Sequence, residues 1–375
     1  MMIATLKEVK DKENRVGLSP AGAKALIRSG SEVLVQKGAG VNAGFSDADY
    51  RKAGAKIVSS ATQIVKKADI IVKVKEPIKS EYKLLDKFKG KTLFTYLHLA
   101  AVDKQLTLRL MRNNITAIAY ETVEDNAGRL PLLRPMSQVA GVLSIQYAAQ
   151  YLQNRYGGRG ITLGKVDNTD TAHVVVVGGG TVGSTAAKTA AGLGCEVAVI
   201  QRKGPRLKKL SSYFREELGS CSKNIKVIPS TPANISRAVK SADVLVGSVL
   251  IKGARTPRIV TKDMVKKMKE GAVIVDVAID QGGCIWGSRP TSHSDPIYML
   301  MGKVYCCITN MPGQVSHQAT QALTQATLPY VLKMSKGVEK ALRADKGLAK
   351  GVNVKDGNVA YKAVAESLKL KCVPI

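Results

Sequence analysis

The stretch HVVVVGGGTVGSTAAKTAA, residues 173–191, sets the fold of the central part of this 375-residue chain. Its apolar run His173–Val177 predicts a buried strand, and the Ala-rich run up to Ala191 predicts a helix. Between them, Gly178, Gly180 and Gly183 form a G-x-G-x-x-G pattern. This spacing permits a tight turn and lets the backbone approach a pyrophosphate, which the helix N-terminus also favours. The stretch predicts a dinucleotide-binding unit, with a tight turn that binds nothing as the alternative.

The next apolar run, Glu196–Ile200, predicts the second strand of this unit. In NAD-binding folds that strand ends in an acid that binds the ribose hydroxyls. Here Gln201, Arg202 and Lys203 follow it, and none of them is an acid. The two cations can neutralise a 2′-phosphate, which favours NADP. A ribose bonded to Gln201, with both cations solvated, favours NAD. The sequence leaves both cofactors open.

Strand-like runs alternate with amphipathic segments along most of the chain, which predicts parallel sheets covered by helices. Ser19 and Pro20 predict the start of the first helix and Gly30 its end. The expected strands are Ile3–Leu6, Glu32–Gln36, Asp69–Val74, Thr92–Tyr96 and Thr116–Tyr120 in the first third, and later Lys226–Ile228, Asp243–Val249 and Ala272–Ala278.

Two long helical stretches predict crossings between two domains. One runs from about Ser137, as its N-cap, to Tyr156, and the other from about Gln314 to Arg343. We therefore expect an α/β protein with two Rossmann-like, doubly wound domains joined by long crossing helices. Residues 1–136 and 310–375 form the expected substrate domain, and residues 137–309 form the dinucleotide-binding domain inserted into it.

Composition argues against several other classes of protein. No apolar run approaches the ~20 residues of a membrane helix, and the first 15 residues lack the pattern of a secretory signal. The six cysteines have no repeating spacing, which favours reduced thiols in the cytoplasm over disulfides or a zinc site. The formal charge is +28, from 57 basic and 29 acidic residues. The lysines are spread along the chain with no nucleic-acid module, so we expect neither a specific nucleic-acid partner nor a membrane partner.

Polar residues near several predicted strands are candidates for substrate binding. Arg15 lies beyond the first strand, Lys75 and His98 follow two later ones, and Asp280 follows the run Ala272–Ala278. Ligands of open α/β sheets bind outside the carboxyl ends of the strands. Arg15 can hold a carboxylate as a bidentate fork, Lys75 as a point charge, and His98 can exchange protons near neutral pH. The alternatives are a hydrogen-bonded buried histidine, a solvated lysine and a turn-capping aspartate.

Many motifs in the same order resemble those of the alanine dehydrogenases, a family that shares ancestry with the NAD-binding part of proton-translocating transhydrogenase. The resemblance runs nearly end to end. It includes Asn14-Arg15-Val16, Lys73-Val74-Lys75-Glu76-Pro77, Tyr96-Leu97-His98-Leu99-Ala100, Pro135-Met136-Ser137, Ala278-Ile279-Asp280-Gln281-Gly282-Gly283, Asn310-Met311-Pro312-Gly313 and Ala326-Thr327-Leu328-Pro329-Tyr330.

The resemblance implies roles for individual residues. Arg15 and Lys75 would bind the carboxylate and 2-oxo group of the substrate, and His98 would transfer protons. Asp280 would orient the ammonium or carbinolamine, and Asn310 would lie beside the nicotinamide or the substrate. The expected cofactor-binding residues are Ser137, Gly178, Gly180, Thr181, Val182, Gly183, Gln201, Arg202, Lys203, Val249, Leu250, Ile279, Asp280 and Met311.

The implied activity is the reversible oxidative deamination of L-alanine to pyruvate and ammonium with a nicotinamide cofactor and no metal. The family also implies a cytoplasmic homohexamer with its active site in the interdomain cleft. Three alternatives stay open: a transhydrogenase-type NAD(H)-binding subunit, a dehydrogenase of another amino acid, and a basic binding protein without activity. Salt-sensitive binding to DNA or RNA would mark the last of these.

Overall fold

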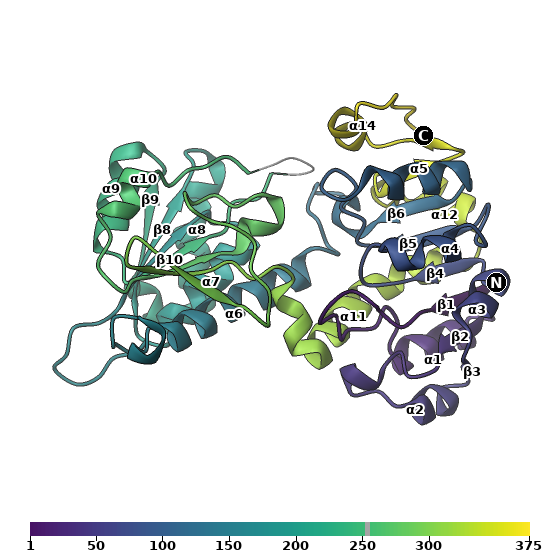
Figure 1. The fold of residues 1–375 in the computed structure, drawn as a ribbon, viewed down its shortest axis with the longest axis horizontal. Coiled ribbons are helices and arrows are strands. Elements are labelled where there is room, and N and C mark those ends of the chain that lie inside the picture. Colours follow the sequence, from purple (N-terminus) through teal and green to yellow (C-terminus); the bar gives the residue numbers. More distant parts are fainter. Residues whose placement is uncertain (252–255) are drawn as a thin grey trace. The chain divides into compact units, whose positions relative to one another are not determined.

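The computed structural model describes residues 1–251 and 256–375, which form two compact units (Figure 1). The first unit holds residues 1–136 and 312–375, and the second holds residues 137–251 and 256–311. Each unit contains one sheet in which most neighbouring strands are parallel, with helices packed along it. The predicted α/β fold with two doubly wound domains is therefore confirmed.

The sheet of the first unit has eight strands in the order β15-β14-β6-β5-β4-β1-β2-β3. The strands β1 to β6 are parallel to one another, and β14 and β15 extend the edge in antiparallel fashion. The chain order reverses between β1 and β4, which makes their carboxyl ends the expected ligand site of this unit. The bounds are β1 Met2–Thr5, β2 Glu32–Gln36, β3 Lys56–Val58, β4 Ile70–Val72, β5 Thr92–Thr95, β6 Thr116–Ala119, β14 Val352–Lys355 and β15 Asn358–Val359.

The helices of the first unit begin with α1, Pro20–Arg28, where the Ser19 hydroxyl accepts a hydrogen bond from the Gly22 amide as predicted. The predicted single helix from Gln314 to Arg343 is wrong. It divides into α11, Ser316–Met334, and α12, Val338–Ala344, because Gly337 has a φ of 120° that no helix contains. The others are α2 Asp47–Lys52, α3 Ala61–Lys67, α4 Tyr82–Leu85, α5 Lys104–Arg112, α13 Lys346–Ala349 and α14 Lys362–Leu368.

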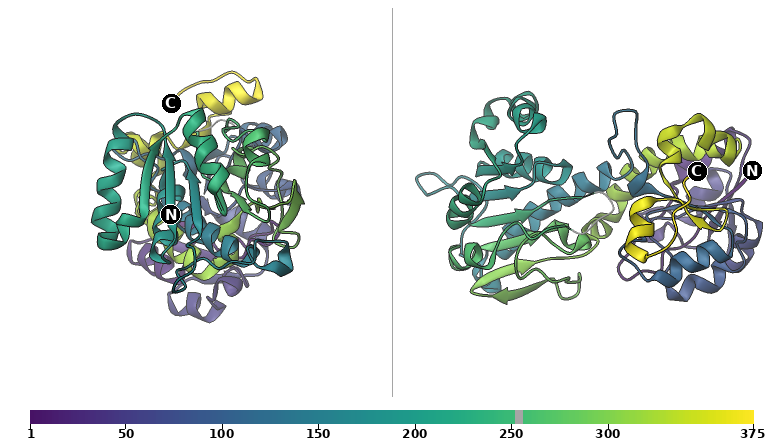
Figure 2. Two further views of the ribbon diagram at one scale, coloured as in Figure 1. Left: turned by 90° about the vertical axis from the view of Figure 1, so that its left-hand side faces the viewer. Right: turned by 90° about the horizontal axis from the view of Figure 1, so that it is seen from above.

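The sheet of the second unit has seven strands in the order β12-β13-β11-β10-β7-β8-β9, in which β12 is antiparallel and the others are parallel. Figure 2 shows this unit, in teal and green, from two further directions. The chain order reverses between β7 and β10, so the loop after β7 lies at the switch point of the sheet. The bounds are β7 His173–Val177, β8 Glu196–Gln201, β9 Ile225–Pro229, β10 Val244–Gly247, β11 Val273–Asp276, β12 Ile297–Leu300 and β13 Lys303–Cys306.

The helices of the second unit include α7 Thr181–Gly192, α8 Pro205–Leu218, α9 Pro232–Ser241 and α10 Lys262–Lys266. The helix α6, Arg134–Tyr151, spans the boundary between the units. The prediction of Ser137 as its N-cap is wrong, because the helix already begins at Arg134, where Pro135 fits the first turn. It also ends earlier than expected, and the turn Asn154–Tyr156 follows it.

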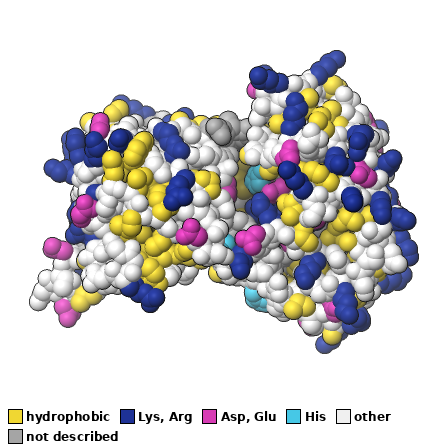
Figure 3. Space-filling model, in the orientation of Figure 1, with side chains coloured by type: hydrophobic (Ala, Val, Ile, Leu, Met, Phe, Trp, Pro, Cys, Tyr) yellow, Lys and Arg dark blue, Asp and Glu magenta, His cyan; other side chains and the backbone are white. Residues whose placement is uncertain are grey.

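Lys and Arg side chains are spread over the visible face of both units (Figure 3). This distribution favours a lysine-rich surface over one concentrated polyanion site. Among residues 1–251 and 256–375, no helix is long and apolar enough to cross a membrane.

Candidate active site

The loop after β7 contains three glycines, which differ in backbone conformation and in the space available for a side chain. Gly178 has a φ of 106°, which a residue with a side chain rarely adopts. A Cβ on Gly183 would lie 1.8 Å from the Gly178 carbonyl oxygen, so the helix can pack on the strand only without it. A Cβ on Gly180 would meet no atom within 4 Å, so the backbone there faces open space. This arrangement fits a pyrophosphate at the N-terminus of α7.

We predict opposite effects for alanine at Gly183 and Gly180. Gly183→Ala should lower the free energy of unfolding by about 1–3 kcal/mol, because the new methyl group overlaps backbone. Gly180→Ala should lower that free energy by less than about 1 kcal/mol, because the new methyl group meets no atom and only the N-cap preference for glycine over alanine is lost, while weakening dinucleotide binding about tenfold or more. Denaturant titration and calorimetric titration with the dinucleotide measure the two quantities. Equal losses of stability in both variants would contradict this division of roles.

The other residues predicted to bind the cofactor follow neighbouring parallel strands. Val249 and Leu250 follow β10, and Ile279 lies in the turn Val277–Gln281 after β11. Asn310 and Met311 follow β13, where both are buried and Asn310 has a φ of 60°. A ring nitrogen of His293 lies 3.3 Å from the Asn310 carbonyl oxygen. The sheet therefore brings these residues to the same edge as the glycine loop, while Ser137 lies on α6.

Gln201, at the end of β8, contacts the glycine loop. Its carboxamide oxygen accepts a hydrogen bond of 2.9 Å from the Gly179 amide. Arg206, in the first turn of α8, donates from Nε to the Gly179 carbonyl oxygen at 2.7 Å. Arg202 and Lys203 are exposed. The sequence analysis missed Arg206, and its place two residues beyond Gly204 at the start of a helix was the available signal.

Arg15 lies in a buried pair with a residue that the sequence analysis missed. Its Nε and Nη2 donate to the two carboxylate oxygens of Glu13 at 2.7 and 2.5 Å, and Nη1 lies 3.0 Å from Sδ of Met136. The attraction to Glu13 raises the pKa of Arg15 although burial acts the other way. Glu13 therefore occupies the fork that the sequence assigned to a substrate carboxylate, and the guanidinium is fixed in one orientation.

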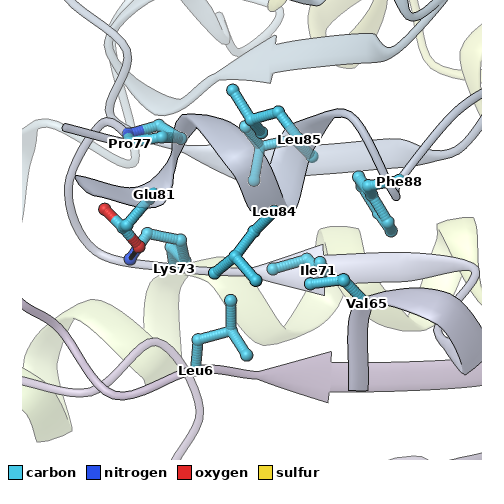
Figure 4. Close-up of a pocket in the computed structure, with 10 residues that line it drawn as sticks. Leu6, Val65, Ile71, Lys73, Pro77, Glu81, Leu84, Leu85 and Phe88 are labelled. Atoms are coloured by element: carbon cyan, nitrogen blue, oxygen red, sulfur yellow. Dashed lines mark hydrogen bonds and ion pairs between the residues drawn. The ribbon is translucent and has the colours of Figure 1, made fainter. Parts of the chain in front are cut away.

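Two buried lysines follow β4, and their surroundings differ. Nζ of Lys73 lies 3.1 Å from a carboxylate oxygen of Glu8 and 2.9 Å from one of Glu81. Lys73 and Glu81 lie at one end of a small cavity whose other walls include Leu84 and Phe88 (Figure 4). Lys73 thus neutralises two buried carboxylates, which is a structural role. Lys75 is 8% exposed, and its carbonyl oxygen accepts a hydrogen bond from the Thr95 hydroxyl.

His98, after β5, is held in an uncommon backbone conformation. Its φ is 47°, and its amide donates to a carboxylate oxygen of Glu121 at 2.6 Å. The ring nitrogen Nδ1 lies 3.9 Å from the same oxygen, and the ring stacks on Tyr96 at 5.8 Å between centroids. About a third of the His98 side chain is exposed. Fixed backbone and solvent access together suit a proton-transfer group.

Asp276 and Asp280 differ in burial and in role. Asp276 is fully buried and accepts hydrogen bonds from the amides of Ala278, Cys284 and Ile285 and from the Ser288 hydroxyl. Burial raises the pKa of Asp276. It holds the turn on which Asp280 lies, and Asp280 itself is exposed. Asp276 therefore has the turn-capping role that the sequence left open for Asp280.

The first unit thus brings Arg15, Lys75 and His98 to the carboxyl ends of β1, β4 and β5, which are adjacent strands. The second unit brings Asp280 and Asn310 to the edge that carries the glycine loop. Within residues 1–251 and 256–375, no group of three His, Cys, Asp or Glu side chains is placed to hold a metal ion.

Comparison with known proteins covers the whole chain. Residues 4–140 match the family "Alanine dehydrogenase/PNT, N-terminal domain", and residues 144–362 match "Alanine dehydrogenase/PNT, C-terminal domain". The chain is 46% identical over 374 residues to an alanine dehydrogenase of Halomonas elongata, with 100% of this chain and 98% of the relative covered. It is 45% identical over 376 residues to one of Methanococcus maripaludis, with the same coverage.

Solved structures give the same result. An L-alanine dehydrogenase superposes with a TM-score of 0.91 at 45% identity, covering 98% of this chain and 99% of that one. A transhydrogenase of Sinorhizobium meliloti superposes with a TM-score of 0.81 at 22% identity, covering 96% of this chain and all of the other, which shows a shared fold. On these grounds the chain belongs to the alanine dehydrogenase/PNT family.

Proposed function

We propose that the protein is an NAD(P)-dependent L-alanine dehydrogenase. The reaction converts L-alanine, water and oxidised cofactor into pyruvate, ammonium, reduced cofactor and a proton. The observation that carries this proposal is that Arg15, Lys75 and His98 follow β1, β4 and β5, which are adjacent strands of the first sheet. Charged groups together with a proton-transfer group suit the binding and conversion of a small-molecule substrate. A subunit that only passes hydride to a partner protein does not need such groups. The roughly 45% identity to alanine dehydrogenases supports the same conclusion.

The proposed division of labour follows from the chemistry of each side chain. Lys75 binds the carboxylate or oxo oxygen of the substrate, and the fixed charge of Arg15 stabilises the same anionic end. A bound nicotinamide cofactor would supply the acceptor for the hydride from C2 of the substrate. His98 accepts a proton from the water that adds to C2, and returns a proton as ammonia leaves. The family resemblance assigns to Asp280 and Asn310 the orientation of the amino group and of the substrate.

Isotope incorporation tests this proposal against its alternatives. With pyruvate, ¹⁵N-ammonium and reduced cofactor, the protein should form ¹⁵N-alanine, which mass spectrometry detects. A dehydrogenase of another amino acid would label a product only when its own 2-oxo acid replaces pyruvate. A transhydrogenase-type subunit would form no labelled amino acid from any 2-oxo acid.

We further propose that the protein accepts NADP as well as NAD. Residues 201–206 contain no acid to repel a 2′-phosphate, and they contain the cations Arg202, Lys203 and Arg206. Arg206 is the best placed, because the bond from its Nε to the Gly179 carbonyl oxygen holds the guanidinium beside the loop and uses one of its five N–H groups. A guanidinium fixed in this way matches the geometry of a phosphate.

Titration with cofactor fragments measures this preference without turnover. We expect 2′,5′-ADP to bind more tightly than 5′-AMP, and Arg206→Gln to reduce that ratio about tenfold or more, the usual effect of losing a charge-assisted hydrogen bond. Arg215→Gln is the matched control, because it removes an equal charge from the opposite side of α8, nine residues later. Equal effects of the two substitutions would show that Arg206 contributes only its charge and makes no specific contact with the 2′-phosphate.

We also propose the homohexamer that the family resemblance implies. Light scattering coupled to size-exclusion chromatography measures the oligomer directly, and a monomer would contradict it.

A further inference from the structure

Ser248, the residue after β10, contacts the glycine loop through its side chain. Its hydroxyl lies 2.8 Å from the Gly178 carbonyl oxygen and 3.0 Å from the Val177 carbonyl oxygen, and it donates its one proton to this pair of acceptors. The Ser248 amide donates separately to the Val177 carbonyl oxygen at 2.9 Å, which continues the pairing of β10 with β7. The hydroxyl of this buried residue therefore adds a contact that the pairing of the strands does not require.

The peptide between Gly178 and Gly179 is held at both of its polar groups. Its carbonyl oxygen accepts from the Ser248 hydroxyl, and its N–H donates to the carboxamide oxygen of Gln201 at 2.9 Å. Ser248 follows β10 and Gln201 ends β8, and these two strands flank β7 in the sheet. Side chains from both neighbouring strands thus fix the orientation of one peptide plane in the loop.

This peptide needs such a restraint because a glycine lies on each side of it. Glycine adopts positive and negative φ about equally well, so a peptide between two glycines can rotate at little cost. Rotation of the peptide would change where the N–H groups and carbonyl oxygens of the loop point. Since N–H groups attract a pyrophosphate and carbonyl oxygens repel it, the orientation of this peptide affects how well the loop binds a dinucleotide.

The next peptide, between Gly179 and Gly180, shows which donor the restraint presents. Its carbonyl oxygen accepts from Nε of Arg206 at 2.7 Å. The carbonyl and the N–H of a trans peptide point in opposite directions, so the Gly180 N–H points away from Arg206. Open space lies beside Gly180, where a Cβ would meet no atom within 4 Å. The Gly180 N–H and the first amides of α7 therefore form the donor set for a pyrophosphate.

We propose that Ser248 is a positioning residue for the dinucleotide. Its hydroxyl holds the Gly178–Gly179 peptide in the orientation from which the next peptide presents the Gly180 N–H to the pyrophosphate. Without this bond a smaller fraction of the molecules would have the loop in the binding conformation, and the apparent affinity would fall by that fraction. The inference rests on the proposed function, of which it needs only the binding of a dinucleotide at the glycine loop.

Ser248→Ala tests the assignment, because it removes the hydroxyl and keeps the backbone bond to Val177. We expect ADP-ribose, which carries the pyrophosphate, to bind about 3- to 10-fold more weakly, the usual effect of one hydrogen bond. Adenosine, which has no phosphate, should bind within about 1.5-fold of the wild type. Calorimetric titration measures the first affinity and NMR titration the second. An equal loss for both ligands, or an unchanged affinity for ADP-ribose, would overturn the assignment.

Ser144→Ala is the matched control. Ser144 is fully buried on α6, and its hydroxyl donates to the Gly141 carbonyl oxygen at 2.7 Å. The Gly141 peptide lies inside a helix, where backbone hydrogen bonds already fix its orientation. This variant should therefore bind ADP-ribose within about 1.5-fold of the wild type. A loss as large as that in Ser248→Ala would show a general effect of losing a buried hydroxyl and would overturn the assignment.

Gln201→Met releases the same peptide at its N–H and provides a second test, also if Ser248→Ala does not fold. It should show the same selective loss of ADP-ribose affinity, and its absence would overturn the assignment. In the double variant the two losses should not add, because either substitution alone releases the peptide. Additive losses would contradict a shared action on one peptide.

Failure of this inference can be distinguished from failure of the proposed function. A wild-type protein that does not bind ADP-ribose would contradict the dinucleotide site itself. A wild-type protein that binds ADP-ribose without oxidising L-alanine would contradict the proposed reaction, and the binding data would still decide the role of Ser248. Tight binding by both the wild type and Ser248→Ala would contradict only the role of Ser248.

Discussion

His98→Ala is expected to reduce turnover at least about 100-fold while leaving dinucleotide binding unchanged. Positioned general acid–base groups contribute about 10²–10⁴ to rate. His98 is the partly exposed titratable group among the three residues that converge in the first unit, where Arg15 and Lys75 are buried. Steady-state kinetics with L-alanine gives the turnover number, and calorimetric titration gives the affinity for the cofactor. Near-wild-type turnover in this variant would remove His98 from the mechanism.

Glu121→Gln tests how Glu121 places His98. The carboxylate of Glu121 accepts a hydrogen bond of 2.6 Å from the His98 amide. The carboxamide oxygen of glutamine can still accept from this amide, so the variant should keep most of its activity. Glu121→Ala removes the acceptor and should reduce turnover about tenfold or more. Equal turnover in the two variants would show that the bond to the His98 amide does not place the ring.

Lys75→Met is expected to reduce kcat/KM with L-alanine by roughly 30-fold to several thousand-fold. Methionine retains most of the packing of the buried aliphatic chain and removes the ammonium that pairs with the substrate anion. Losing one partner of a desolvated charge pair costs about 2–5 kcal/mol, which corresponds to roughly 30- to several-thousand-fold in affinity for the transition state. The loss should appear in both kcat and KM, because the charge binds the substrate and polarises its oxo group.

Lys73→Met is the matched control, two residues earlier and equally buried. This substitution leaves Glu8 and Glu81 without their shared cation, which typically costs about 3–5 kcal/mol of stability. The loss in Lys73→Met should therefore appear in the free energy of unfolding, and the loss in Lys75→Met in kcat/KM. Denaturant titration of both variants therefore complements the kinetics. A stable, inactive Lys73 variant together with an unstable, active Lys75 variant would reverse the two assignments.

The parallel strand–helix pattern allowed the edges that carry the candidate site to be predicted. Lys75 and His98 were recognised because apolar runs end just before them, and the glycine loop because its spacing has a specific backbone meaning. Helix ends were less accurate. Pro135 starts α6 before Ser137, and Gly337 breaks the last long helix.

The hydrogen-bond and ion-pair partners of the site residues could not be predicted from the sequence. Glu13 is two residues from Arg15, but a fork between them depends on a turn that spacing does not reveal. Glu121 reaches His98 from the neighbouring strand, 23 residues away, and only the order β6-β5-β4 brings them together. The short strands β3 and β12 to β15 were missed as well, because two to four residues give no clear period.

The most direct test of the proposed function is the absorbance of reduced nicotinamide when the wild-type protein is mixed with L-alanine and either NAD or NADP. We predict a steady increase with both cofactors, dependent on L-alanine. No increase with either cofactor, in a folded protein that still binds the dinucleotide, would contradict the assignment of Arg15, Lys75 and His98 to an alanine-oxidising site.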